Sequence, residues 1–300
     1  MSRLLPAEPS AKAALVALTV LNLVWGGSLP ATKVALASFS PLVLTALRLV
    51  VAALLFGWLV GIGPIIRLGW KQGAVATGLG VIGYTGTQAL QAIGTAGTDA
   101  ASATVLMVTA PLWIAILAAV VLQEKVTLAS AAGLVLALAG VVLVSGLAED
   151  WPPNGSALSG LIVLAAGAAL ALYTVLGKAA LRRVEPLVFI ETGCIGGAIT
   201  SLPLGMWQAS TQPQAPTLAG WLMLAYLALV VTFAGFIVWF WGVRAVPAGQ
   251  AGALMFLQPV SGLTLSAAIL GDHLSSTFLT GAALVLIGTY LAAAFRRHGS

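Results

Sequence analysis

Two stretches of the chain follow one pattern: APLWIAILAAVVLQEKVTLASAAGLVLALAG at residues 110–140 and QPVSGLTLSAAILGDHLSSTFLTGAALVLIG at residues 258–288. A shift of 148 positions places Pro111 on Pro259 and Glu124 on Asp272. Three further pairs match at the same shift: Met107 with Met255, Gly133 with Gly281, and Gly140 with Gly288. Sequences rich in Ala, Leu and Gly align easily by chance, but prolines, glycines and acids matched at one spacing favour an internal repeat.

A second pair of stretches extends the repeat toward the start of each half. ATKVALASFSPLV at residues 31–43 matches LGKAALRRVEPLV at residues 176–188 at a shift of 145 positions, which aligns Lys33 with Lys178. The longest polar break, EDWPPNGS, lies between the halves. We therefore expect a first repeat over residues 1–148, an extracytoplasmic linker over 149–156 and a second repeat over 157–300.

The composition indicates a membrane protein. Of 300 residues, 60% are hydrophobic and 7% are charged, whereas a soluble domain carries about 25% charged residues. The formal charge of +5 comes from basic residues scattered between apolar runs, so we expect no nucleic-acid partner. The single cysteine, Cys194, can form neither an internal disulfide nor a thiolate metal site.

The apolar runs predict an all-α polytopic membrane protein with ten transmembrane helices, each of about 20 residues. The predicted segments are residues 13–32, 41–60, 73–93, 100–122, 127–147, 157–180, 187–207, 218–241, 248–270 and 276–295. Cytoplasmic N- and C-termini are predicted, because eleven Lys and Arg residues then lie inside and only Lys33 lies outside, with Arg48 in the second segment. Each half has five segments, an odd number, so the repeat is inverted, which is typical of secondary transporters with a site near the midplane.

Several short motifs are shared with a known family. They are Trp25-Gly26 followed by Lys33, the Leu47-Arg48 pair, and the unit from Ala110-Pro111 to Glu124 with its repeat from Gln258-Pro259 to Asp272. In these motifs and over nearly its whole length, the chain resembles the drug/metabolite transporter superfamily, specifically its ten-span EamA type. Within that type it looks most similar to bacterial exporters of aromatic amino acids.

The resemblance implies a basket-like bundle around a central cavity, formed mainly by the first, third, fourth, sixth, eighth and ninth segments. It also implies export of small metabolites across the cell inner (cytoplasmic) membrane. Alternating access through that cavity would suit two inverted halves that can exchange conformations.

The third segment carries the clearest candidate cavity face. Tyr84, Gln88 and Gln91 recur at helical spacing, and glutamine in hydrocarbon is costly unless it is paired or wetted. The alternative is hydrogen bonding between helices. A shift of 148 positions places three residues of the eighth segment opposite this face: Thr232, Phe236 and Trp239. One polar wall facing one aromatic wall would suit a ligand with an amino-acid head and a flat apolar side chain.

The first segment supplies further cavity candidates: Asn22, Trp25 and Ser28, spaced about one helical turn apart. An interfacial position is the alternative for Trp25. The shift of 145 positions maps Ser28 onto Tyr173. Met107 and Met255 are candidate adaptable wall residues, with ordinary packing as the alternative.

Five residues are candidates for gating or helix bending: Pro30, Lys33, Pro111, Lys178 and Pro259. Proline frees a backbone carbonyl inside a helix, and each lysine could instead anchor its helix at the membrane surface. Arg48 and Glu191 are charges within predicted segments. We expect both to snorkel or anchor locally near the ends of their segments. We expect no direct contact of either with the substrate, because the resemblance places neither segment at the cavity.

Other protein classes fit the sequence less well. GLGVIG, residues 78–83, has dinucleotide-fingerprint spacing but lies in an apolar segment, so we expect its glycines to serve close helix packing. A membrane enzyme would need clustered catalytic side chains, and a channel would need a filter or charged rings. We expect a small-molecule substrate and the lipid bilayer as partners, no metal, no cofactor and a monomer. Facilitated uniport is the leading mechanism, and a proton-coupled antiporter with another substrate is the alternative.

Overall fold

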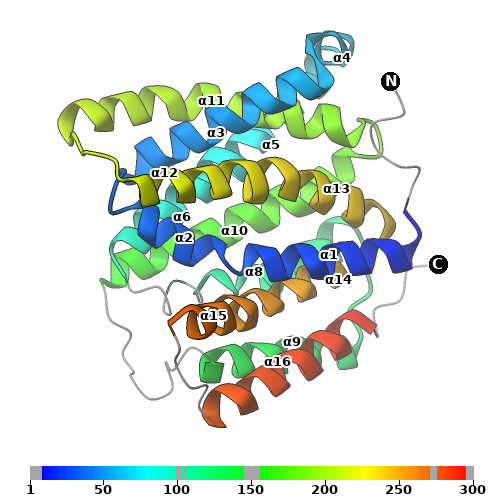
Figure 1. Cartoon of the computed structure of the whole chain (residues 1–300). Helices are drawn as coiled ribbons and strands as arrows, with labels where there is room; N and C mark the ends of the chain where they lie inside the picture. Colours follow the sequence, from blue (N-terminus) through cyan, green and yellow to red (C-terminus); the bar gives the residue numbers. More distant parts are fainter. Residues whose placement is uncertain (1–8, 99–102, 104–105, 145–155, 271–275, 295–300) are drawn as a thin grey trace.

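The computed structural model describes residues 9–98, 103, 106–144, 156–270 and 276–294. Every element of this part is helical (Figure 1). The first half contains α1 (Ala11–Trp25), α2 (Ser28–Ala35), α3 (Pro41–Val60), α4 (Ile62–Arg67), α5 (Trp70–Gly80), the π-helix η1 (Val81–Gly86), α6 (Thr87–Ala96), α8 (Ala110–Val121) and α9 (Leu128–Val144).

The second half follows this order with three differences. It contains α10 (Ala157–Ala180), α11 (Pro186–Thr211), α12 (Leu218–Ala225), the π-helix η2 (Tyr226–Ala234), α13 (Gly235–Ala245), α14 (Ala248–Ala253), the 3-10 turn η3 (Leu254–Phe256), α15 (Leu257–Leu270) and α16 (Ser276–Ala294). The helix α10 is continuous where the first half has α1 and α2, α4 has no counterpart, and α14 and η3 match residues 100–108, which are described only in part. Pro41 and Pro186, a matched pair, begin α3 and α11, where proline loses no helical hydrogen bond.

Five helical stretches are long and apolar enough to cross a membrane, judged by length and composition: Ala11–Ala35, Pro41–Val60, Ala157–Ala180, Pro186–Thr211 and Leu218–Ala245. Shorter apolar helices lie over Ala110–Val121, Leu128–Leu143 and Leu279–Ala293. The described helices overlap all ten predicted segments, and the count of ten spans stays a prediction. Four segments are longer than predicted: α2 continues to Ala35, the third segment runs from Trp70 to Ala96, α11 continues to Thr211 and α13 to Ala245.

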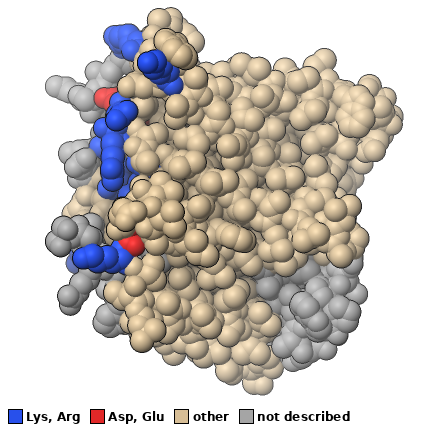
Figure 2. Space-filling model, turned by 180° about the vertical axis from the view of Figure 1, so that it is seen from behind, with Lys and Arg blue, Asp and Glu red and all other residues tan. Residues whose placement is uncertain are grey.

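The outer surface matches a lipid environment. Large apolar side chains such as Trp58, Ile66 and Leu128 are exposed on it. Figure 2 shows the Lys and Arg side chains gathered along one end of the molecule. We call this the basic end, and it carries the basic residues at the ends of α4, α10 and α13, at the start of α5 and between α8 and α9: Arg67, Lys71, Lys125, Lys178, Arg182, Arg183 and Arg244. By the charge rule it is the predicted cytoplasmic end.

The two halves meet reciprocally at α9 and α16, which lie side by side (Figure 1). A Cβ atom on Gly133 would lie 2.6 Å from the Gly288 carbonyl oxygen, and one on Gly140 would lie 2.7 Å from that of Gly281. These four glycines are the pairs matched in the sequence. Gly133 faces Gly288, which is the match of Gly140, and Gly140 faces Gly281, which is the match of Gly133. A two-fold axis between the repeats produces reciprocal contacts of this kind.

The packing of the other helices follows the same symmetry. The helix α1 packs against α13 and α15, and its counterpart α10 packs against α6 and α8. The third and eighth segments each contain a π-helical stretch, η1 and η2, at matched positions. Such stretches are frequently found at functional sites.

Close helix contacts explain the glycines of the first segment. The helix breaks at Gly26-Gly27 between α1 and α2, where one continuous segment was predicted. Pro30 lacks the N–H that would bond the Gly26 carbonyl, and a Cβ on Gly262 of α15 would lie 2.5 Å from that carbonyl oxygen. In the GLGVIG stretch, Gly80 packs against Gly193 and Gly83 against Tyr173, but Gly78 faces open space, so the packing expectation was wrong for Gly78.

Candidate functional site

A cavity of about 50 Å³ lies between the two halves. It is lined by Trp25, Ser28, Arg48, Thr87, Gln88, Gln91, Met107, Leu170, Val231, Phe236, Met255 and Gln258. Three pairs among them are repeat-related: Trp25 with Leu170, Gln88 with Phe236, and Met107 with Met255. The cavity therefore lies where the two halves face each other.

Seven of the twelve residues predicted for a cavity line this one: Trp25, Ser28, Gln88, Gln91, Met107, Phe236 and Met255. Amide groups come from α6, and rings come from α1 and α13. The indole of Trp25 is held by a hydrogen bond of 3.1 Å from its Nε1 to the Val231 carbonyl and lies 5.8 Å, centroid to centroid, from Phe236. A polar wall and an aromatic wall thus share one small space.

The other five predicted residues lie outside the lining. Tyr84, Tyr173 and Trp239 belong to a buried aromatic cluster with Phe189, Phe236 and Phe240. Trp239 joins this cluster through Trp25, whose ring centroid is 5.5 Å away. Asn22 and Thr232 support lining residues, as Asn22 Oδ1 accepts a 2.8 Å hydrogen bond from Gln258 Nε2.

The aromatic cluster fills the space between the cavity and the basic end. The segment with Tyr84 and Gln88 runs away from the basic end, so Tyr84 lies nearer to that end than Gln88 does. The segments with Tyr173 and Trp239 run toward the basic end, so these two residues lie nearer to it than the lining residues Leu170 and Phe236. Tyr84, Tyr173 and Trp239 are among the largest fully buried side chains of the protein. Toward the opposite end, Leu29 and Val108 line a small extension of about 10 Å³.

Five lining residues were not predicted: Arg48, Thr87, Leu170, Val231 and Gln258. Leu170 and Val231 are ordinary apolar residues, and nothing in the sequence distinguishes them. Gln258 is a polar residue next to a matched proline, a signal that could have placed it here.

Arg48 departs most clearly from expectation. Its side chain is buried, and its Nε donates a 2.6 Å hydrogen bond to Thr232 Oγ1 in the other half. The Thr232 hydroxyl in turn donates to the Leu227 carbonyl of η2 at 2.9 Å. The expectation of a local anchor was therefore wrong for Arg48, because its long side chain crosses from α3 to η2. Glu191 does not snorkel either, since it is 1% exposed.

The matched prolines stand at the start of half-helices. Pro111 is in the first turn of α8 and Pro259 in the first turn of α15. Each lies four residues after a cavity methionine, Met107 or Met255. Interrupted helices of this kind beside a midplane site are typical of secondary transporters.

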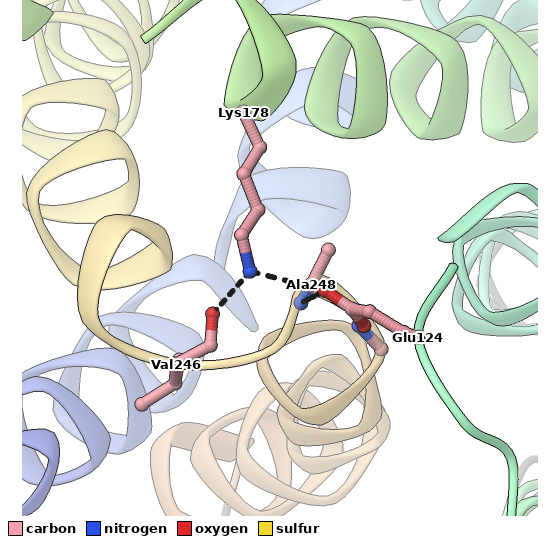
Figure 3. A network of polar contacts seen from close by, with 5 residues as sticks. Glu124, Lys178, Val246 and Ala248 are labelled. Carbon is pink, nitrogen blue, oxygen red and sulfur yellow. Dashed lines mark hydrogen bonds and ion pairs between the residues drawn. The ribbon is translucent and has the colours of Figure 1, made fainter. Parts of the chain in front are cut away.

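A polar network at the basic end is centred on Lys178 (Figure 3). Its ammonium lies 3.1 Å from Glu124 Oε1 and donates a 2.6 Å hydrogen bond to the Val246 carbonyl. The Glu124 carboxylate also accepts hydrogen bonds from the backbone N–H groups of Ala248 at 2.7 Å and Gly249 at 3.1 Å. The network joins the loop after α8, the end of α10 and the α13–α14 connection.

At the opposite end, Lys33 donates to the carbonyls of Thr95 at 3.0 Å and Thr98 at 2.8 Å. Thr98 is the repeat counterpart of Val246. Asp272, the counterpart of Glu124, lies outside the described residues.

A larger hollow of about 570 Å³ opens at the basic end beside α4. Its walls come from the end of α3, from α4 and α5, and from the start of α11, and include Arg67, Arg183 and Glu185. It contains none of the repeat-related pairs, so we assign the functional site to the smaller central cavity. Within the part of the chain that the structure describes, no group of three His, Cys, Asp or Glu side chains could hold a metal ion.

Comparison with known proteins gives the family of the chain. A model of the EamA-like transporter family matches residues 12–146 and 158–294, one match in each half. An uncharacterized transporter of Archaeoglobus fulgidus is 27% identical over 278 residues, which cover 92% of this chain and 96% of that protein. A probable terminal-alkyne amino-acid exporter of Streptantibioticus cattleyicolor is 27% identical over 281 residues, covering 93% of this chain and 92% of that protein.

One crystal structure of another protein superposes on this chain with a TM-score of 0.77 at 22% identity. The match covers 95% of this chain and 99% of the other. It shows that the two chains share a fold.

Proposed function

The chain belongs to the EamA-like transporter family, and on that premise we propose that it exports small amphipathic metabolites, foremost aromatic and other neutral amino acids. The observation that carries the proposal is the central cavity, in which Gln88 and Gln91 share the walls with Trp25 and Phe236. Amides suit the polar head of an amino acid, and aromatic rings suit a flat apolar side chain. The similarity to a probable amino-acid exporter supports the same substrate class.

Transport proceeds by alternating access between the two sides of the cell inner membrane. The conformation described here is closed at the basic end by the aromatic cluster and by the Glu124–Lys178 network. Release toward the opposite end then requires that the walls around Ser28, Gln91 and Met107 separate. Because the halves are related by symmetry, the reverse movement opens the basic end.

The cavity must expand to hold its substrate. A volume of about 50 Å³ has room for a few water molecules, whereas sites for drug-sized ligands span about 300–1,000 Å³. Met107 and Met255 can adjust their rotamers, and the π-helical stretches beside the cavity offer backbone positions that can shift.

Uniport, driven by the substrate gradient, fits the lining, because its described residues include neither Asp nor Glu. One observation favours the proton-coupled alternative: both carboxylate oxygens of Glu191 are buried without a hydrogen-bond partner among the described residues. Intramembrane acids of this kind serve proton relays in other transporters. Glu191 lies on α11, which supplies no lining residue.

Counterflow in proteoliposomes tests the proposed function. Vesicles loaded with unlabelled phenylalanine, tryptophan, threonine or tetraphenylphosphonium are given the same labelled compound outside. We expect uptake of phenylalanine and tryptophan above that of the other two. Gln88→Ala should abolish most of the uptake, whereas the control Gln72→Ala, on an exposed glutamine outside the cavity, should not.

Two outcomes would change the proposal. Uptake of threonine or the cation alone would move the substrate class while leaving the transporter family in place. Uptake that rises only when a proton gradient is imposed, at clamped membrane potential, would replace uniport with proton coupling.

A further inference from the structure

Arg48 is the one charged side chain among the described lining residues. It is 6% exposed, and its guanidinium makes one hydrogen bond within the described chain, from Nε to Thr232 Oγ1. A guanidinium has five N–H donors in a planar fork. The bond to Thr232 uses one of them and fixes the direction of the group, so the other donors remain for a ligand in the cavity.

Arg48 forms no ion pair in the described part of the protein. The lining contains no carboxylate, and the ion pair found among the described residues is that of Lys178 with Glu124 at the basic end. A buried charge without a partner costs several kcal/mol. Ionisable groups inside a membrane protein mark substrate or ion pathways by default. The missing negative charge therefore points to the ligand.

The neighbouring groups define the rest of that ligand. Both amide atoms of Gln88, Oε1 and Nε2, are buried without a hydrogen-bond partner in the described chain. An amide oxygen can accept from an ammonium group, and the faces of Trp25 and Phe236 can receive an apolar ring or the ammonium itself. The counterpart of Arg48 in the second half is Gly193, so the site offers one cationic fork.

We propose that Arg48 binds the carboxylate of the transported ligand, so that the site takes monocarboxylates and zwitterionic amino acids and rejects organic cations. Bidentate Arg–carboxylate pairs combine charge with fixed geometry, which a lysine cannot reproduce. This inference rests on the proposed function in that both use the central cavity. It adds the group that recognises the substrate, and binding can test it without transport.

The test compares two probes of nearly equal shape, 3-phenylpropionate and its amide, 3-phenylpropanamide. Thermal unfolding of the purified full-length protein in detergent is followed while each probe is titrated. A ligand that binds the folded state alone raises the unfolding temperature. We expect a rise with the carboxylate and none with the amide. Arg48→Gln should weaken carboxylate binding about tenfold to a hundredfold, as for other hydrogen bonds to charged groups.

Two further variants keep the result interpretable. Arg48→Lys retains the charge without the fork and should bind the carboxylate with intermediate strength, which also covers the case in which Arg48→Gln fails to fold. Arg67→Gln, at the basic end and outside the cavity, should bind like the unaltered protein.

Equal responses to carboxylate and amide, no response to either, or full binding by Arg48→Gln would each overturn the role of Arg48. A carboxylate response that depends on Arg48, combined with no counterflow of any amino acid, would uphold the binding site and overturn the proposed transport function. Counterflow of phenylalanine that is unchanged in Arg48→Gln would uphold the proposed transport function and overturn the role of Arg48.

Discussion

Lys178 and Lys33 occupy matched positions at opposite ends of the bundle, and their hydrogen-bond partners among the described residues differ. Both ammonium groups donate to matched carbonyls, Lys178 to Val246 at 2.6 Å and Lys33 to Thr98 at 2.8 Å. At the basic end the Glu124 carboxylate joins the contact, 3.1 Å from Lys178, and also accepts two backbone N–H groups. The lysine–carbonyl bond thus occurs in both halves, and at the basic end the Glu124 carboxylate ties three segments together. Asp272, its counterpart at the other end, lies outside the described residues.

The largest expected effect comes from removing that carboxylate. Glu124→Ala deletes an ion pair and two charge-assisted hydrogen bonds, which together favour the closed basic end by roughly 2–4 kcal/mol. We expect counterflow to fall by about tenfold or more, because the protein then populates the state open at the basic end. Counterflow in proteoliposomes measures this. Glu185→Gln, an acid at the same end without a side-chain capping bond, is the matched control and should transport normally.

Comparing the two lysines gives the next largest effect. Lys178→Gln removes the ion pair with Glu124 and the hydrogen bond to the Val246 carbonyl, whereas Lys33→Gln removes hydrogen bonds to two carbonyls. We therefore expect Lys178→Gln to reduce transport several-fold more than Lys33→Gln, since it breaks an ion pair that connects three segments at the basic end. Initial rates of efflux and influx measure both. Equal losses would contradict the larger contribution expected of the Glu124–Lys178 pair.

The glycine contacts between α9 and α16 test the symmetry itself. Gly140→Ala and Gly288→Ala each press a methyl group into the partner backbone and should destabilise the protein by about 1–3 kcal/mol. Because the positions are matched, the two losses in thermal stability should be similar. Gly57→Ala, where nothing lies within 4 Å, is the control and should be neutral or slightly stabilising. A large loss for one of the two matched variants alone would contradict the two-fold relation.

The smallest effect is expected at Glu191. Its carboxyl lies on α11, which supplies no group to the cavity lining, so under uniport Glu191→Gln should leave the rate of counterflow within about twofold of normal. The rate should also be equal with and without a proton gradient at clamped membrane potential. A gradient-driven flux that disappears in Glu191→Gln would establish coupling through this residue.

The sequence predicted the helical architecture well, because apolar runs and matched prolines and glycines report directly on membrane spans and repeats. It indicated Pro30 as a candidate for a helix bend, and the break lies close by, at Gly26-Gly27, where Gly262 approaches the Gly26 carbonyl. It did not predict the π-helical stretches or α4, for which the sequence holds no local signal.

The cavity was predictable where a polar side chain interrupts an apolar segment, as at Gln88 and Gln91. Tyr84 lies on the same predicted face but turns into the aromatic cluster, since its ring packs 4.7 Å from Phe236 and 5.4 Å from Tyr173. Arg48 was not predicted as a lining residue because the position of its helix does not show where its long side chain ends. Its guanidinium acts where the side chain ends, next to Thr232 of the other half.

Access to the cavity from each side tests the account most directly. Ser28→Cys, in a Cys194→Ala background, places one thiol in the lining, since Cys194 is the single native cysteine. A membrane-impermeant maleimide is applied to intact cells and to inverted vesicles, with Glu124 present or replaced by alanine. The account predicts faster labelling from outside when Glu124 is present, and a marked rise in labelling from the cytoplasmic side when it is absent. Labelling mainly from the cytoplasmic side with Glu124 present, or no change on its removal, would contradict it.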